Sequence, residues 1–202
     1  MNYLAIDTCG TALTVAVSYN GKTKIHYAPD CGVKHSVDLM PAVENALLET
    51  GFNLSNADFI AVVVGAGSFT GIRIGVATAK ALCFAYKKPC LAITSFDTLA
   101  YNRTDGKTLA VIDAKHDSFY VCGYTDGKES FPPSFIPRSE LDELLKDYSA
   151  VSIAPISGIE SQLVSIADGL IKAVEDKSDK ATFDLDEIVP LYIRKSQAEE
   201  GR

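Results

Sequence analysis

The chain has 202 residues, of which 47% are hydrophobic and 22% charged, an ordinary composition for a globular protein that can bury a core without disulfides. Its formal net charge of −7 argues against a basic surface for nucleic acid, so any service to RNA would rely on a partner to contact the phosphates. No run approaches the ~20 apolar residues of a membrane-spanning helix, and we expect no signal peptide because the N-terminus lacks a basic region followed by an apolar one.

The first half of the chain predicts a meander followed by alternating helices and strands. Asn20-Gly21 is a strong hairpin signal between two strand-like segments. In the helical segment after the meander, Leu39, Val43 and Leu47 recur at four-residue spacing, Gly51 suits the stop, and Pro41 should bend the helix or lie near its first turn. We expect strands at 3–7, 12–19, 22–28, 57–65 and 89–95, and helices at 35–51, 68–87 and 96–102. This order is typical of an α/β unit of about 100 residues.

The second half partly repeats the first after a polar break at 103–107. "LAID" at 4–7 and "AVID" at 110–113 each end a strand in Asp and turn into a second strand, which is a weak internal duplication. We therefore expect two related lobes, 1–103 and a shorter 104–202. The expected elements after the second strand pair are a loop at 132–137, a helix at 139–149, a strand at 150–155, a helix at 159–176, and a short helix or frayed end within 183–202.

A glycine-rich turn at 65–71 raises the question of phosphate binding. Gly65, Gly67 and Gly71 give G-x-G-x-x-x-G. The dinucleotide fingerprint needs G-x-G-x-x-G, and the P-loop needs a Lys that this turn lacks. The spacing favours a tight turn between strand and helix, while a helix N-terminus still offers N–H groups for some anion contact.

The helix after this turn is small or apolar over most of its circumference. Gly71, Gly75 and Ala79 fall at four-residue steps, and its charges Arg73 and Lys80 form one narrow stripe. Two helical glycines each cost about 1 kcal/mol against alanine, so close backbone approach should offset them. The excess of apolar surface over what one sheet needs predicts an interface with another protein; the alternative is that the second lobe covers it. The predicted interface residues, with those of the preceding helix, are Leu39, Met40, Val43, Gly71, Arg73, Gly75, Val76, Ala79 and Lys80.

Candidates for other chemistry are few. Asp7, Gly10 and Thr11 lie in a strand–turn–strand that could hold Mg²⁺-bound phosphate, although an ordinary hairpin explains them equally, and the counterpart "DAKHDSFY" has no glycine. The histidines do not have metal-ligand spacing, so we expect no metal site, and there is no G-x-S-x-G nucleophile elbow. We expect no catalytic residue.

The cysteines point to a reducing environment. Five are present, an odd number, and no C-x-x-C pair occurs. Such usage is typical of a cytoplasmic chain with free thiols.

"GAGSFTGIRIGVATAKALC" closely resembles the G-P-G-S-F-T-G-L-R-I-G signature of the bacterial TsaB (YeaZ) family, with Ala66 in place of the usual proline. "LAIDTCGTALTVAV" resembles the family's I-D-T-S start, and "HSVDLMPAVENAL" its H-S-x-x-L-x-P-x-I segment. "VIDAKHDSFYVCGY" resembles D-A-R-x-x-x-V-Y, and "VPLYIR" the late P-x-Y-x-R. The match is specific in the first lobe and loose in the second.

The resemblance implies an actin-like (ASKHA, ribonuclease H-like) α/β fold of two related lobes, with mixed sheets flanked by helices. It implies a non-catalytic component of the threonylcarbamoyltransferase complex, which makes threonylcarbamoyladenosine in tRNAs that read codons beginning with A. The expected partners are the catalytic paralogue TsaD, whose metal-binding H-x-x-x-H this sequence lacks, and the ATPase TsaE. The family's first-lobe helices, here beginning near Ser36 and Ser68, also pair in homodimers. The chain would contact tRNA only indirectly, and would meet ATP or ADP with Mg²⁺ only within the complex.

Two other functions remain open from the residues. One is an ATP-dependent actin-like phosphotransferase acting on a small metabolite, with Asp7 and Asp113 near Mg²⁺. It would need a second phosphate turn and an adenosine-binding G-G segment, and neither is evident in the sequence. The other is the peptidase suggested by the family's glycoprotease-like label, for which no residues are evident.

Overall fold

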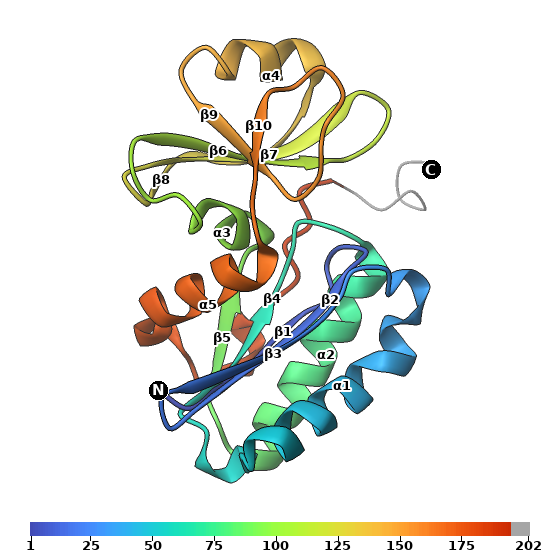
Figure 1. The fold of residues 1–202 in the computed structure, drawn as a ribbon, viewed down its shortest axis with the longest axis vertical. Helices are drawn as coiled ribbons and strands as arrows, with labels where there is room; N and C mark the ends of the chain where they lie inside the picture. The colour runs from blue at the N-terminus through green and yellow to red at the C-terminus, as the bar shows by residue number, and fades with distance from the viewer. Residues whose placement is uncertain (195–202) are drawn as a thin grey trace. The chain divides into compact units, whose positions relative to one another are not determined.

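A computed structural model describes residues 1–194, apart from the side chain of Val33. The chain divides into two compact units: Met1–Ser95 with Ala173–Leu191, and Phe96–Lys172 with a stretch that starts at Tyr192 (Figure 1). This differs from the predicted single boundary between 103 and 104. Helix α3 (Ser95–Ala100) falls almost entirely in the second unit, and the chain returns to the first after residue 172.

The first unit is built on a five-stranded mixed sheet of order β3-β2-β1-β4-β5. Its strands are β1 (Tyr3–Asp7), β2 (Leu13–Tyr19), β3 (Lys22–Ala28), β4 (Phe59–Val63) and β5 (Cys90–Ile93). β1, β2 and β3 are antiparallel, whereas β4 and β5 run parallel to β1. Asn20 and Gly21 both have positive φ, at 51° and 74°, so the predicted hairpin turn is confirmed.

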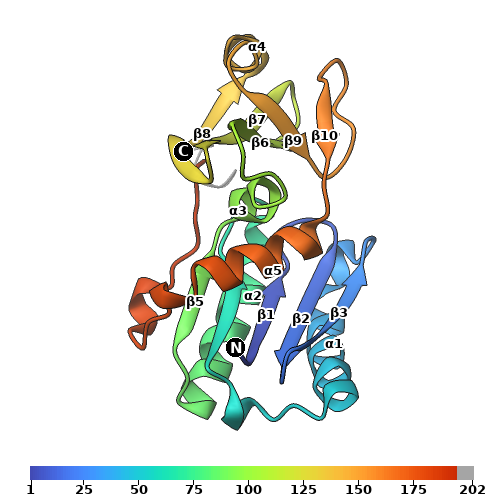
Figure 2. The same ribbon diagram turned by 60° about the vertical axis from the view of Figure 1, so that its left-hand side comes forward.

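Two helices cover one face of this sheet. Figures 1 and 2 both show α1 (His35–Thr50) and α2 (Phe69–Tyr86) side by side there. The predicted stop of α1 is confirmed, because Gly51 adopts φ 64° and its N–H reaches the carbonyls of Leu47 and Leu48. Pro41 lies inside α1, which continues through it. Short 3₁₀ turns complete the unit: η1 (Gly32–Lys34), η2 (Leu54–Asn56), η3 (Ser178–Lys180) and η4 (Leu185–Glu187).

The second unit has a sheet of order β10-β9-β6-β7-β8. Its strands are β6 (Lys107–Asp113), β7 (Ser118–Thr125), β8 (Lys128–Pro137), β9 (Ser149–Ser152) and β10 (Ser161–Leu163). Helix α4 (Arg138–Leu144) precedes β9, and α5 (Ile166–Asp176) begins in this unit and ends in the first. Leu109, Val111, Phe119, Val121 and Leu141 form its core.

The two sheets repeat one topology. Each has an antiparallel meander of three strands, then a helix, then two strands parallel to the first. Asp7 ends the first strand of one unit and Asp113 ends the first strand of the other. The weak duplication in the sequence therefore reflects a structural repeat, and the predicted actin-like α/β fold is confirmed.

Three predictions in the second unit were wrong. Residues 132–137, predicted as a loop, are the end of β8, and residues 161–163, predicted as helix, form β10. Helix α4 is shorter than predicted, ending at Leu144. The predicted short helix or frayed end within 183–202 is a 3₁₀ turn at Leu185–Glu187, and its remainder beyond residue 194 lies outside the described residues.

Candidate functional site

The glycine-rich turn is packed against the turn that joins β1 to β2. A Cβ atom on Gly67 would overlap the carbonyl oxygen of Cys9, and one on Gly71 would overlap that of Thr8. A Cβ on Gly75 would lie 2.5 Å from the Thr8 hydroxyl oxygen. Since real side chains do not approach so closely, these three glycines are needed to bring α2 against β1. The predicted turn for close approach is therefore confirmed.

Three backbone donors at the start of α2 are used within the chain. The N–H of Ser68 donates to the carbonyl of Cys9 over 2.8 Å, and that of Ile72 donates to the carbonyl of Ser68. The N–H of Gly71 donates to the Ser68 hydroxyl, which caps the helix. These three donors are therefore not aimed at a ligand, as they would be in a phosphate cradle.

Asp7 is buried, whereas the other two residues of the predicted cofactor site are not. Its side chain is 5% exposed and accepts the N–H of Cys9 over 2.8 Å, while Gly10 and Thr11 are exposed. Burial raises the pKa of Asp7, and the bond from Cys9 opposes this rise. The carboxylate is thus tied into its own turn, and its role toward a cofactor stays a prediction.

The equivalent turn of the second unit, between β6 and β7, is stabilised in a different way. Lys115, His116 and Asp117 all have positive φ, at 68°, 53° and 54°, although none is glycine. Asp113 accepts the Lys115 N–H over 2.8 Å and its ammonium over 3.1 Å. The N–H bond is the main reason that the pKa of Asp113 lies below its usual value. Two aspartates at matching places therefore meet opposite environments.

Among residues 1–194, no three His, Cys, Asp or Glu side chains gather as they would around a metal ion. No helix in the same range combines the length and apolar character that a bilayer crossing requires.

Most of the predicted interface residues lie inside the first unit. The chain itself buries Leu39, Val43, Gly71, Gly75, Val76 and Ala79. These six therefore face the interior of the unit, and their place in a partner interface stays a prediction. Met40 and Arg73 are exposed and Lys80 is half-buried, donating to the carbonyl of Ile188 over 3.4 Å.

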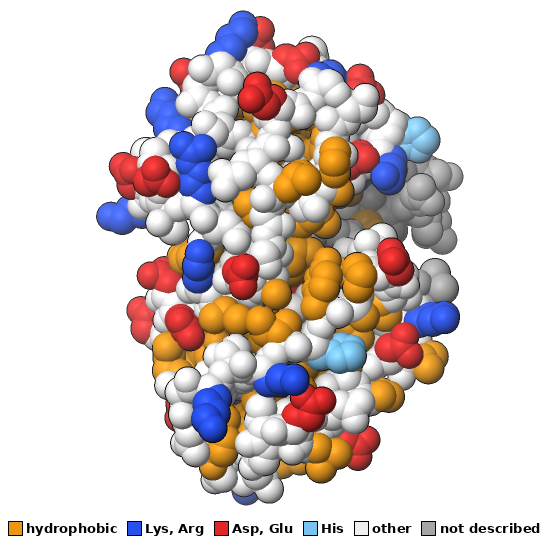
Figure 3. Space-filling view, in the orientation of Figure 1, with side chains coloured by type: hydrophobic (Ala, Val, Ile, Leu, Met, Phe, Trp, Pro, Cys, Tyr) orange, Lys and Arg blue, Asp and Glu red, His pale blue; other side chains and the backbone are white. Residues whose placement is uncertain are grey.

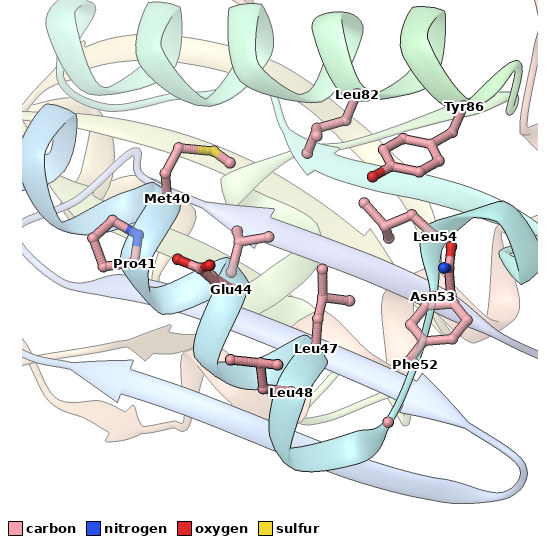
Figure 4. A pocket seen from close by; sticks show the side chains of 12 residues that line it. Met40, Pro41, Glu44, Leu47, Leu48, Phe52, Asn53, Leu54, Leu82 and Tyr86 are labelled. Carbon is pink, nitrogen blue, oxygen red and sulfur yellow. The ribbon is translucent and has the colours of Figure 1, made fainter.

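An apolar groove of about 660 Å³ lies between the outer sides of α1 and α2. Figure 4 shows Met40 and Leu47 of α1 on one side, Leu82 and Tyr86 of α2 on the other, and Leu54 nearby. Glu44 is the one charged residue of its lining. We call this the α1/α2 groove; its full lining is Met40, Pro41, Val43, Glu44, Leu47, Leu48, Gly51, Phe52, Asn53, Leu54, Leu82 and Tyr86.

Large apolar side chains of the groove are open to solvent. Leu48 is 72% exposed, Met40 48% and Tyr86 41%. The last turn of α2 also carries Phe84, which is 81% exposed. Figure 3 shows hydrophobic side chains interspersed with charged ones on the part of the surface that the first unit forms. Exposed large apolar side chains that gather along a groove are a common feature of interaction sites.

Comparisons with known proteins agree with this architecture. Over 98% of its length the chain is 28% identical to "tRNA threonylcarbamoyladenosine biosynthesis protein TsaB" of Escherichia coli, covering 96% of that protein. It is 30% identical to an uncharacterized protein of Mycobacterium tuberculosis, over 96% of this chain and 92% of the other. A family model, "TsaD: tRNA N6-adenosine threonylcarbamoyltransferase", matches residues 28–136. The chain belongs to the TsaB (YeaZ) family, which is related to TsaD.

A solved structure supports the same assignment. "YeaZ from Pseudomonas aeruginosa" superposes with a TM-score of 0.78 at 25% identity, covering 95% of this chain and 99% of the other. The predicted family is thereby confirmed.

The exposed residues of the α1/α2 groove were mostly missed from the sequence. Leu48 and Tyr86 could have been found, because they are large apolar residues outside the buried stripe of their own helix.

Proposed function

We propose that this chain is the non-catalytic subunit that binds TsaD and supports it in tRNA threonylcarbamoyladenosine modification, for tRNAs that read ANN codons. Membership of the TsaB family supports the pathway, because the Escherichia coli relative is named for it. The α1/α2 groove is the observation that supports a binding role. In the cytoplasm, the α1/α2 groove joins two copies of the chain when TsaD is absent. TsaE joins the larger assembly, and the chain contacts tRNA only through these partners.

The chemistry of the groove suits a protein partner. Its exposed residues are long or aromatic apolar side chains, the types that anchor interfaces when a partner covers them. The partner surface expected is apolar, with a cation placed to meet Glu44. Two copies of the chain would fit less well at that point because their Glu44 side chains would add like charges, so TsaD should displace the homodimer.

Variants of the groove test the proposal. Leu48→Lys and Met40→Lys place a charge in the groove, and each new Lys lies four residues from Glu44, so the helix keeps its stability. We expect each to weaken association with TsaD at least tenfold, about 1.4 kcal/mol, in sedimentation or titration calorimetry. Phe183→Lys is the matched control, because Phe183 is 74% exposed in the same unit outside the groove.

Three results would count against the proposal. The first is no association between the wild-type chain and TsaD at micromolar concentration. The second is equal loss of binding in Phe183→Lys and Leu48→Lys. The third is full tRNA modification by reconstituted TsaD and TsaE without this chain. Tight Mg²⁺-dependent ATP binding by the isolated chain would instead favour the phosphotransferase alternative.

A further inference from the structure

Another pocket, of about 570 Å³, is lined only by residues of the second unit. It lies where β9 and β10 begin, since Ser149 and Ala150 start β9 and residues 158–160 lead into β10. These two strands run parallel to each other and to β6, whose carboxyl end carries Asp113 (Figure 2). We call this the amino-end pocket, because it lies at the opposite end of the parallel strands from the Asp113 turn.

The walls of the amino-end pocket are held in place by the chain itself. The Arg138 guanidinium donates to the carbonyl of Ser157 over 3.0 Å and to that of Gly158, which fixes the loop before β10. Tyr148, which also lines the pocket, shares a hydrogen bond of 3.1 Å with the Ser130 hydroxyl. The pocket is therefore preformed, as small-molecule sites usually are.

Two residues of opposite charge, Arg103 and Glu160, line the pocket. They form no ion pair with each other. The Arg103 guanidinium lies 3.7 Å from Asp105, whose side chain is 90% exposed. Exposed pairs of this kind contribute little, so a ligand carboxylate can replace Asp105. Glu160 is exposed, and in the part of the chain that the structure describes its carboxylate pairs with no cation.

The rest of the lining joins an apolar surface to a few polar groups. Leu145, Ala150 and Ile159 provide the apolar part, and Ala150 and Ile159 are buried. The exposed residues Ser149 and Gln162 provide a hydroxyl and an amide. An apolar wall with a small number of polar and charged groups is the usual composition of a site for a small molecule.

We propose that the amino-end pocket binds a small zwitterion, with one carboxylate and one ammonium group on an apolar body. The Arg103 guanidinium pairs with the ligand's carboxylate, and the Glu160 carboxylate pairs with its ammonium. The apolar body packs on Leu145 and Ile159. A simple anion would be repelled by Glu160 and a simple cation by Arg103, so a ligand with both charges fits best. Free amino acids and short peptides share this chemistry, and the site needs no protein partner.

Titration of the wild-type chain with leucine, followed by NMR of the backbone N–H groups, tests the site directly. We expect saturable shifts at Ser149, Gly158 and Gln162 and none at Leu48 of the α1/α2 groove. Leucine amide lacks the carboxylate, and N-acetylleucine lacks the ammonium. Each should bind at least about tenfold more weakly, because each leaves one charged residue of the pocket unpaired. Leucyl-leucine separates the two sources: tighter binding than leucine indicates a short peptide, and weaker binding a free amino acid.

Variants test the two contacts one at a time. Arg103→Gln should bind leucine and leucine amide equally, because the group that distinguishes them is gone. Glu160→Gln should likewise bind leucine and N-acetylleucine equally. Glu129→Gln is the matched control, since Glu129 is exposed in the same unit outside the pocket, and it should keep the wild-type preferences. Absence of saturable shifts in the wild-type chain, or equal binding of leucine and its two derivatives, would overturn the proposal, and neither result requires a variant to fold.

Discussion

The close approach of α2 to the turn after β1 predicts a measurable coupling between Gly75 and Thr8. Gly75→Ala gains about 1 kcal/mol of helix propensity. Its new Cβ would lie 2.5 Å from the Thr8 hydroxyl oxygen, and overpacking of this kind costs about 1–3 kcal/mol. We therefore expect the single variant to lower the free energy of unfolding by roughly 0–2 kcal/mol.

Thr8→Ala removes the atom that the new Cβ would meet. It also removes the hydrogen bond from the Thr8 hydroxyl to the Gly71 carbonyl, which spans 2.7 Å, and a buried methyl group, for a loss of about 2 kcal/mol. In the double variant the overlap is gone while the propensity gain remains. The double variant should therefore be more stable than the sum of the two single effects by about 1–3 kcal/mol.

Urea unfolding followed by circular dichroism measures all four proteins of the cycle. Gly10→Ala is the matched control, because its Cβ would come no closer than 3.9 Å to another atom, and its effect should add to that of Thr8→Ala. Additive effects at Gly75 and Thr8 within about 0.5 kcal/mol would refute the view that this glycine exists for close packing.

Further predictions concern the two aspartate turns and the loop before β10. Burial raises the pKa of Asp7, so the contribution of this carboxyl group to stability is complete at low pH. This contribution is lost as the pH rises through the raised pKa and the buried group becomes charged. Asp7→Asn, which stays neutral, should therefore raise the Tm at neutral pH. Asp113 behaves in the opposite way, because its pKa is lowered in the folded protein. Its contribution to stability is present at neutral pH and is lost as the pH falls. Asp113→Asn should therefore make the Tm fall less steeply as the pH is lowered. His116→Gly relieves a left-handed conformation and should add about 1 kcal/mol in urea unfolding, where a loss would contradict the strain. Arg138→Lys should cost about 1–2 kcal/mol, because the guanidinium donates to the carbonyls of Ser157 and Gly158 and a lysine cannot reach both in that geometry.

Much of the fold follows from local signals in the sequence. The Asn20-Gly21 turn, the stop at Gly51 and the apolar runs of β1 and β4 each suffice to predict an element. The wrong predictions lie where the structure of a segment depends on pairing with a strand that is distant in the sequence. Pro132 and Pro133 indicate a loop locally, yet β8 is an edge strand of its sheet, where prolines are tolerated. β10 exists only because Ser161–Leu163 pair with β9.

The candidate interface was harder to predict than the fold. Gly71, Gly75 and Ala79 mark a stripe of close contact along α2, but spacing does not say whether a sheet or a partner lies against that stripe. In the structure, the atoms closest to Gly71 and Gly75 belong to Thr8, which directly follows the chain's own β1. The residues that remain open to solvent, Met40 and Leu48 above all, lie beside the buried stripe that was used to find the core.

The two units differ where the proposed partner binds. β4 and β5 are joined through the 18-residue helix α2, whereas β9 and β10 are joined by the eight residues 153–160, which contain no helix. The pairing of α1 with a second crossover helix thus occurs in the first unit alone. A chain with one such face forms a closed pair, with itself or with a related protein, because extension into a filament needs a second, different face. The crossover helix that lines the α1/α2 groove thus has no counterpart in the connection between β9 and β10, and this asymmetry favours the proposal of a subunit that pairs once.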